Sequence, residues 1–391
     1  MLSRNRPLDY LEELQTSEPD LASDIAELAS WYQRKLWHQL TMKLESCFNS
    51  AGFNKGCLPV DLFQSFISDF AHKINLLKLA HFAVHASKYC SSPTSSIELL
   101  NATKVKLEEM KVAHRAAEPT LFLNMHIAQY NIETGDLPEA KALVEAGKET
   151  LERLSDVDPS VSAAVHFVAS LYYKGISNYS EFYRSTLMYL SFVSSDSLPE
   201  DFKIRMAVDV SLAALLGEGI YSFGQLLQHP LAAALDNGPH KWLHDMLKVF
   251  NEGNLHEYDQ LCSRHAAQLN AQPALVAHER RLREKITLMS VVEMVLSLPA
   301  EERRISFAEM GSRTKLDTDG VEFLLMKALS LHLVEGSVDQ VEGIVHVSWV
   351  QPRILTKPQI HGVKDRLDSW ISKVASAAVT LENESGGVVA V

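Results

Sequence analysis

The segment ISFAEMGSRTKLDTDGVEFLLMKALSLHLVEGSVDQVEGIVHVSWVQPR, residues 305–353, carries the pattern that decides the fold of the C-terminal part of this chain. A short apolar start at 305–307 precedes two helical patterns, 307–314 and 317–333, and two strand patterns, 334–338 and 344–350. In the last strand, alternation predicts that the side chains of Val345, Val347 and Trp349 share one face. The order strand, helix, helix, strand, strand is typical of a winged-helix module.

Carboxylates dominate the part of this module that would meet nucleic acid. In DNA-binding winged helices, the second helix enters the major groove and the hairpin touches the backbone, so both need Lys and Arg to neutralise phosphate. Between residues 317 and 349, one lysine, Lys327, stands against six carboxylates: Asp317, Asp319, Glu322, Glu335, Asp339 and Glu342. We therefore expect the module to bind protein. A nucleic-acid-binding regulator is a disfavoured alternative.

Length and charge agree with a protein-binding role. A chain of 391 residues exceeds the length at which one core usually stops growing, so two or more structural units are expected. The formal net charge of -12 disfavours nonspecific binding to nucleic acid or anionic membranes. The N-terminus has no apolar run of the kind found in secretory signals, and the longest nearly apolar stretch, 163–173, is too short for a membrane helix.

Helical periodicity dominates before about residue 300. In residues 137–154 one face is apolar, and the preceding Gly135 and Asp136 supply a helix stop and an N-cap, with Glu139 in capping-box register. The pattern Gly-Asp-x-x-x-Ala resembles the inner turn of a tetratricopeptide-type repeat, although no strict 34-residue period is present. The predicted fold class is therefore mainly α, an N-terminal helical solenoid followed by a winged helix and a C-terminal helix.

These patterns also predict domain limits. The predicted parts are a helical repeat region at 1–170, a second domain at 171–353 with a helical part at 171–298 and a winged helix at 299–353, a terminal helix at 356–382 and a flexible tail at 383–391.

The terminal helix carries a regular apolar seam. Its apolar residues are spaced alternately by three and four positions, as at the a and d positions of a coiled coil: Ile360, Val363, Leu367, Trp370, Val374, Ala377 and Leu381. The seam either packs back on the winged helix of its own chain or packs against helices of other subunits.

Signals for catalysis or cofactor binding are weak. Gly217, Gly219 and Gly224 do not have the spacing of a phosphate-binding loop and are interpreted as a tight turn between helices. The pairs His81 with His85 and His240 with His244 could each share a helix face, but no third metal ligand lies nearby in the sequence. We predict no catalytic residues, cofactor or metal, and no enzymatic activity.

Two further groups of residues have a structural interpretation. The four cysteines, Cys47, Cys57, Cys90 and Cys262, have no regular spacing and are expected to be reduced, mostly buried thiols of an intracellular protein. A basic cluster, Arg280, Arg281, Arg283 and Lys285, is interleaved with glutamates. It is interpreted as a solvated helix face, with a docking patch for an acidic partner as the alternative.

A helical solenoid that leads into an acidic winged helix resembles the layout of PCI-domain proteins, a family named for the proteasome lid, the COP9 signalosome and translation initiation factor 3. Six strings are similar to PCI subunits of the 26S proteasome lid: WYQRKLWHQLT (31–41), LAALLGEGIYSFGQLLQHPL (212–231), FNEGNL (250–255), LLMKALSLHLVEGSVDQV (324–341), HVSWVQPRIL (346–355) and GVKDRLDSW (362–370). The similarity covers almost the whole chain, with residues 90–160 less distinctive.

The resemblance implies a non-catalytic scaffold of the proteasome regulatory particle, found in cytoplasm and nucleus, that supports ubiquitin-dependent degradation. Its winged helix would join other PCI and lid subunits edge to edge, and its last helix would enter a helical bundle. The partner-binding residues would then be Val345, Val347, Trp349, Ile360, Val363, Leu367, Trp370, Val374 and Leu381. A scaffold role in the COP9 signalosome or in translation initiation factor 3 is the alternative.

Overall fold

The structure is a computed structural model that describes residues 6–50, 52–110, 113–236, 238–298, 303–355 and 357–385. Its contacts divide the chain into two compact units, Met1–Leu198 and Pro199–Val391. The predicted limit between the first two domains, at residues 170 and 171, lies inside a helix. Among the described residues, no helix is both long enough and apolar enough to cross a membrane.

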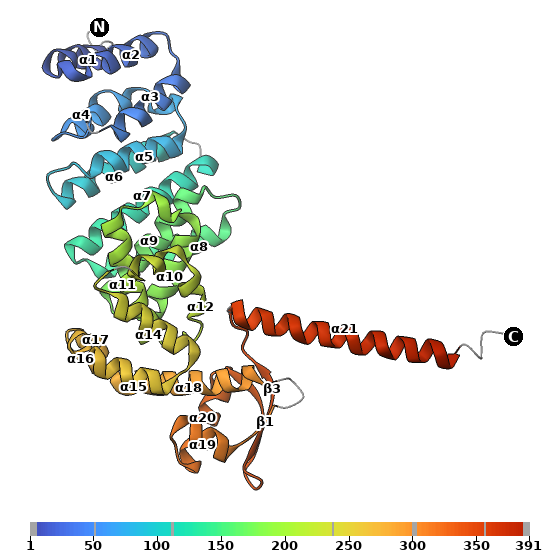
Figure 1. Ribbon diagram of the computed structural model, residues 1–391. Helices are drawn as coiled ribbons and strands as arrows, with labels where there is room; N and C mark the ends of the chain where they lie inside the picture. The colour runs from blue at the N-terminus through green and yellow to red at the C-terminus, as the bar shows by residue number, and fades with distance from the viewer. Residues whose placement is uncertain are drawn as a thin grey trace. The chain divides into compact units, whose positions relative to one another are not determined.

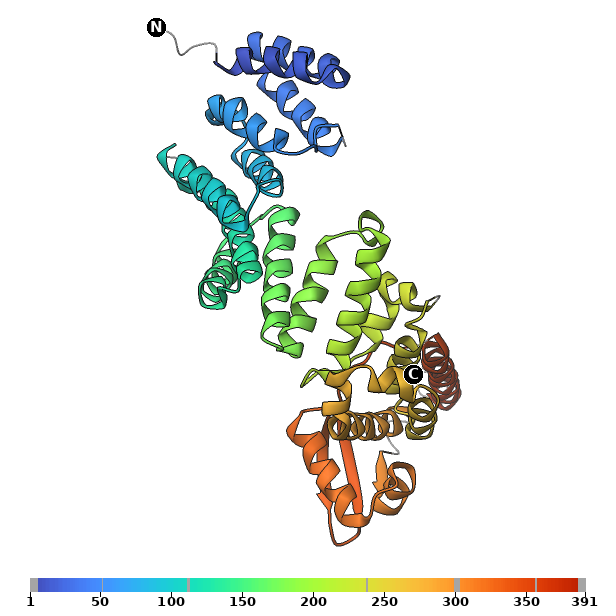
Figure 2. The same cartoon turned by 90° about the vertical axis from the view of Figure 1, so that its left-hand side faces the viewer.

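The first unit is built only from helices in its described part. Each helix packs mainly on its neighbours in the sequence, and α9 and α10 run side by side (Figures 1 and 2). This is the predicted helical solenoid. The α-helices are α1 (Arg6–Ser17), α2 (Ala22–Gln33), α3 (Trp37–Asn49), α4 (Leu58–Ser65), α5 (Leu76–Ser87), α6 (Pro93–Glu109), α7 (Ala113–Thr134), α8 (Leu137–Arg153), α9 (Pro159–Gly175) and α10 (Tyr179–Phe192). Short 3-10 turns occupy Pro19–Leu21, Ile67–Asp69, Ala71–Lys73 and Ser195–Ser197.

The predicted corner between α7 and α8 is confirmed. Gly135 has a φ of +87°, a conformation that glycine adopts at little cost, and it ends α7. The side chain of Asp136 accepts a hydrogen bond from the backbone N–H of Glu139 at 3.3 Å and so begins α8. Local sequence therefore fixes where this helical pair turns.

His126 on α7 gives the first unit a testable pH dependence. Its ring packs against Phe122 at a centroid distance of 4.8 Å, and burial lowers the pKa of His126 to about 4. An unfolded histidine titrates near its ordinary value of 6.5. Between these two pH values the unfolded chain binds more protons than the folded chain, so stability falls as the pH falls.

We expect His126→Gln to remove part of this acid sensitivity. Each pKa unit corresponds to about 1.4 kcal/mol, so the variant should gain about 1–2 kcal/mol relative to the wild type when the pH is lowered from 7 to 5. Urea denaturation of both chains at the two pH values measures the difference. If the two chains lose the same stability between pH 7 and pH 5, His126 does not titrate in this range.

The second unit begins with helices, and its described residues before the winged helix form α11 to α18. They are α11 (Glu200–Leu216), α12 (Gly224–Gln228), α13 (Pro230–Asp236), α14 (Lys241–Glu252), α15 (Leu255–Arg264), α16 (Ala266–Asn270), α17 (Pro273–Ala277) and α18 (Glu279–Ser297). The last of them, α18, packs against α11, α14, α15 and α17 and also against α19 and β3 of the winged helix. The predicted boundary near residue 300 lies outside the described residues.

The turn between α14 and α15 leaves no room for a side chain. Gly253 has a φ of +64°, and a Cβ atom there would lie 2.7 Å from the backbone of Met289 in α18. Gly253→Ala should therefore destabilise the protein by about 2–4 kcal/mol, the sum of left-handed strain and a backbone clash. Thermal unfolding measures this loss.

Gly219 offers a matched control for this substitution. Its φ is +72°, but a Cβ there would meet nothing within 4 Å. Gly219→Ala should therefore show only the strain of the left-handed conformation, about 1–2 kcal/mol. If the two variants lose equal stability, the backbone clash at Gly253 does not contribute to the destabilisation.

The winged helix has the predicted order. It consists of β1 (Arg304–Ser306), α19 (Phe307–Thr314), α20 (Thr318–Ser330), β2 (Val334–Asp339) and β3 (Ile344–Val350). Its three strands form an antiparallel sheet in the order β1-β3-β2. Its core combines residues of α18 with the sheet and both helices, and it includes Leu288, Val291, Val295, Ile305, Met310, Val321, Leu325 and Val345.

The prediction that Trp349 shares a face with Val345 and Val347 is wrong. The pairing of β2 with β3 is irregular between Glu335 and Gly336, so Trp349 pairs with Glu335 whereas Val347 pairs with Gly336. This bulge reverses the alternation, because one extra residue moves every later side chain to the other face. Val350 is buried in its place, and Trp349 is exposed.

The terminal helix α21 occupies Lys357–Ser385. It continues into the segment that was predicted to be a tail, and residues 386–391 lie outside the described part. Figure 1 shows it extending away from the other elements of its unit.

Candidate protein-interaction surfaces

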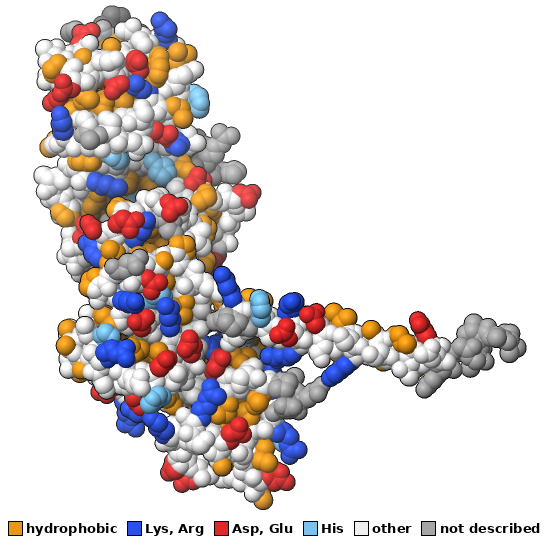
Figure 3. Space-filling view, in the orientation of Figure 1, with side chains coloured by type: hydrophobic (Ala, Val, Ile, Leu, Met, Phe, Trp, Pro, Cys, Tyr) orange, Lys and Arg blue, Asp and Glu red, His pale blue; other side chains and the backbone are white. Residues whose placement is uncertain are grey.

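The apolar seam of α21 is exposed in this chain. Its large side chains are between 40% and 65% exposed: Ile360, Val363, Leu367, Trp370, Val374 and Leu381. Orange side chains accordingly mark the helix along its length in Figure 3. Packing back on the winged helix of the same chain, one of the two alternatives for the seam, is not what this structure contains.

The connector that leads into α21 is fixed by a buried arginine. The Nη1 atom of Arg353 donates to Glu293 Oε2 of α18 at 2.8 Å, and its Nη2 atom donates to Asn251 Oδ1 of α14 at 3.1 Å. Gln359, in the first turn of α21, donates to the other oxygen of Glu293 at 3.1 Å. The start of α21 is therefore attached to the helical part of its unit.

The candidate partner-binding residues of the sheet lie in two different environments. Val345 and Val347 are buried in the core of the winged helix, and their strand, β3, is the central one. Their side chains are therefore not on the surface, contrary to the sequence-based hypothesis. Trp349 is exposed, and the outer edges of the sheet belong to β1 and β2.

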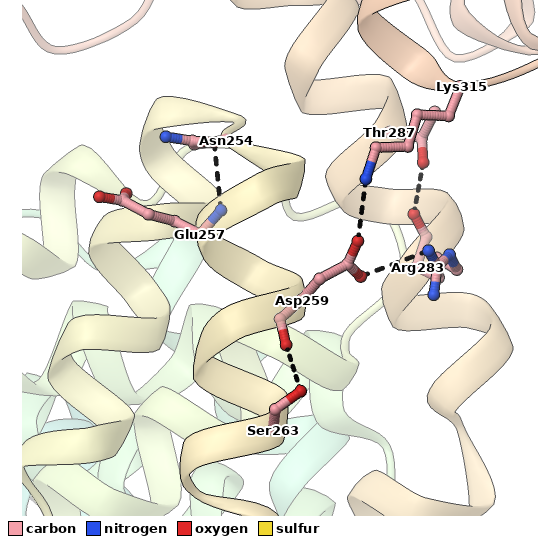
Figure 4. Close-up of polar contacts among 7 residues, drawn as sticks. All are labelled: Asn254, Glu257, Asp259, Ser263, Arg283, Thr287 and Lys315. Atoms are coloured by element: carbon pink, nitrogen blue, oxygen red, sulfur yellow. Dashed lines mark hydrogen bonds and ion pairs between the residues drawn. The ribbon is translucent and has the colours of Figure 1, made fainter.

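A carboxylate links the winged helix to the helices before it (Figure 4). Asp259 on α15 forms two ion pairs, one from its Oδ1 atom to Arg283 of α18 and one from its Oδ2 atom to Lys315, each at 3.3 Å. Lys315 ends α19 in the left-handed conformation, with a φ of +60°. Because these groups are largely exposed, we expect them to orient the module more than they stabilise it.

The basic cluster on α18 is not a uniformly solvated face, so that interpretation is wrong for Lys285. Arg281 pairs with Glu218 at 2.8 Å, and Arg283 pairs with Asp259. Lys285, by contrast, is only 5% exposed.

The ammonium group of Lys285 caps the C-terminus of α11. It donates to the backbone carbonyl oxygens of Ala214 at 2.7 Å, Leu215 at 3.2 Å and Gly217 at 2.9 Å. Burial lowers the pKa of Lys285 to about 7, whereas the carbonyl groups at a helix C-terminus favour a cation. Gly217 and Gly219 lie in the connection between α11 and α12, and Gly224 begins α12, so these glycines belong to an interhelical connection, as predicted.

Histidines and cysteines serve packing or single hydrogen bonds. His81 shares a 3.2 Å hydrogen bond with Ser160, and His244 pairs with Asp236. Among the described residues, no group of three or more His, Cys, Asp or Glu side chains is arranged to hold a metal ion. All four cysteines are free thiols, but only Cys47 is buried; Cys57 is exposed, so the expectation of mostly buried thiols is wrong.

Comparison with known proteins assigns both halves of the chain. A family model described as PSD13 N-terminal repeats matches residues 24–247, and the PCI domain model matches residues 256–349. The 26S proteasome non-ATPase regulatory subunit 13 homolog A of Arabidopsis thaliana is 44% identical over 383 residues, which cover 98% of this chain and 99% of the relative. The chain belongs to the family of 26S proteasome non-ATPase regulatory subunit 13.

Membership of the subunit 13 family extends to distant relatives. The subunit 13 of Dictyostelium discoideum is 32% identical over 388 residues, covering 98% of this chain and 99% of its own. The 26S proteasome regulatory subunit RPN9 of Saccharomyces cerevisiae is 31% identical over 375 residues, with 94% of each chain covered.

A translation initiation factor relative matches far less of the chain. Subunit M of eukaryotic translation initiation factor 3 from Drosophila grimshawi is 27% identical over 143 residues, 37% of this chain. Unlike this partial match, the likeness to the subunit 13 family spans both units.

Proposed function

We propose that this protein is a non-catalytic scaffold subunit of the lid of the 26S proteasome regulatory particle and supports ubiquitin-dependent protein degradation. The observation that carries the proposal is similarity over nearly the whole chain to relatives that are named as regulatory, non-ATPase proteasome subunits. A scaffold needs apolar surfaces that are exposed in the isolated subunit and become buried when its partners bind. The exposed seam of α21 is such a surface.

The main contact of this scaffold is the seam, which binds helices of other lid subunits. Spacing by three and four residues lets side chains of a partner helix interlock with those of α21. Helices of the subunit's partners would cover Leu367 and Trp370, which are more than half exposed in the chain alone. The seam residues Ile360, Val363, Leu367, Trp370, Val374 and Leu381 are accordingly proposed as partner contacts.

The sheet edge provides a second contact, to the winged helix of a neighbouring PCI subunit. β2 lies at one edge of the sheet, where unpaired backbone N–H and C=O groups can receive another strand. Trp349, exposed on the adjacent strand, lies beside Glu335 of this edge. The expected partners are proteins of the same complex in the cytoplasm and the nucleus, without nucleic acid or membrane.

Native affinity purification tests this assignment. A chain tagged at its N-terminus should co-purify with the other subunits of the regulatory particle in equal amounts, as counted by native mass spectrometry. Recovery of COP9 signalosome or initiation factor 3 subunits in their place would contradict the proposal. The partial likeness to initiation factor 3 subunit M makes that comparison necessary.

A further inference from the structure

The outward face of α20 carries apolar side chains that its own fold does not use. Val321, Leu324, Leu325 and Ala328 face the core of the winged helix. On the opposite side, Phe323 is 66% exposed and Met326 is 60% exposed. The two residues are three positions apart and therefore lie next to each other on the helix surface. We call Phe323 and Met326, with the carboxylates around them, the α20 face.

The α20 face is rimmed by negative charge. Asp319 lies one turn before Phe323 on the exposed side of the helix, and Glu322 precedes Phe323 directly. The amide of Gln340, in the turn between β2 and β3, donates to Glu322 at 3.0 Å, so the partner of this carboxylate is a neutral group. Asp339, the last residue of β2, accepts hydrogen bonds from the backbone N–H groups of Val341 and Glu342, which carry no charge.

Lys327, the one lysine between residues 317 and 349, does not offset that negative charge. Lys327 is directed to α18, where its ammonium pairs with Glu284. Acidic and apolar side chains lie close together over the winged helix in Figure 3, with Val341 of the turn being 97% exposed. The α20 face therefore combines apolar side chains with unneutralised carboxylates.

We propose that the α20 face docks a basic amphipathic helix of another protein. The apolar pair at positions i and i+3 on a regular helix matches a second helix laid across it, whereas an added strand would bind at the sheet edge. Lys or Arg residues on both sides of the partner's apolar stripe complement Asp319, Glu322 and Asp339. Phosphate backbones and anionic lipids are repelled by the same carboxylates. This contact goes beyond the scaffold role, because neither α21 nor the sheet edge provides it.

Site-specific photo-crosslinking tests the proposal in the assembled complex. p-Benzoylphenylalanine is placed at position 323 of the full chain, the complex is purified through the tag and irradiated, and the crosslinked peptide is sequenced by mass spectrometry. We expect a peptide of another subunit with apolar residues at helical spacing and several Lys or Arg. A crosslink to an acidic peptide, to a strand or to nucleic acid overturns the proposal.

A second position separates this inference from the lid assignment. The same amino acid at position 370 reports on the α21 seam, and the tag reports on assembly. If position 370 crosslinks to regulatory-particle subunits and position 323 gives none, the α20 face is not a docking surface although the assembly is correct. If the complex is not recovered from the wild-type chain, the proposed function itself has failed.

Charge reversal tests the recognition chemistry. Asp319→Lys together with Glu322→Lys, introduced beside the crosslinker at 323, should lower the crosslink yield roughly tenfold. The matched control is Glu12→Lys with Glu13→Lys, an exposed pair on α1, which should leave the yield unchanged. Equal yields in the two charge-reversed chains would show that the partner is not recognised through its positive charge.

Discussion

Replacing Leu367 and Trp370 by glutamine is expected to leave the chain folded and to abolish its stable incorporation into the proteasome regulatory particle. Both side chains are more than half exposed in the isolated chain, so their loss removes little packing within it. Glutamine also has a high helix propensity, and α21 should persist. In the complex, burial of each large apolar side chain is worth about 2 kcal/mol, so the double variant should lose roughly a thousandfold in affinity.

The matched control for this experiment is Ser372→Gln, on the opposite side of α21 from the seam. Size-exclusion chromatography and circular dichroism of each purified chain report on folding, and co-purification of the other subunits reports on incorporation. Normal incorporation of the Leu367 and Trp370 variant would show that the seam is not the principal contact. A loss of incorporation by the Ser372 variant as well would point to the helix as a whole and not to its apolar seam.

Lys285→Met is expected to destabilise the second unit by about 3 kcal/mol. Methionine fills a similar volume but has no N–H, so the carbonyl oxygens of Ala214, Leu215 and Gly217 lose the donor that the structure gives them. A buried acceptor without a donor costs about 1–3 kcal/mol, and relief from burying a cation offsets only part of the sum. Guanidinium denaturation of the full chain, followed by tryptophan fluorescence, measures the change.

Arg280→Met is the comparison for this variant, because Arg280 is an exposed cation on the same helix. An exposed substitution of this kind should change stability by less than about 0.5 kcal/mol. If the two variants are equally stable, water replaces the ammonium of Lys285 at the end of α11 without cost. Destabilisation confined to Lys285→Met would establish that this lysine joins α18 to α11.

The winged helix could be predicted closely from sequence because its signals are local. Asp317 and Ser306 cap the two helices through their own side chains, and β-branched alternation marks the strands. The apolar seam of α21 was also predicted from the sequence, because heptad spacing depends only on residues along one helix. Its exposure in the isolated chain required the structure.

Features that depend on distant partners were not predicted. Lys285 stands among arginines and glutamates, and nothing nearby in the sequence indicates that its acceptors lie about 70 residues earlier, at the end of α11. The displacement of Trp349 arises from a bulge in the pairing with β2, which alternation within β3 alone cannot reveal. The α20 face was recognised as acidic, but the exposed pair Phe323 and Met326 emerged only when the buried side of the helix was known.

The double use of α18 constrains how this region can be divided between genes. Leu288, Val291 and Val295 of α18 belong to the core of the winged helix, while Lys285 of the same helix closes α11. A winged helix severed before β1 would lose one wall of its core, and the remaining helices would display that wall to solvent. Recombination between related genes can therefore exchange the winged helix only together with α18. The smallest segment that can be exchanged with its core intact is therefore the winged helix together with α18.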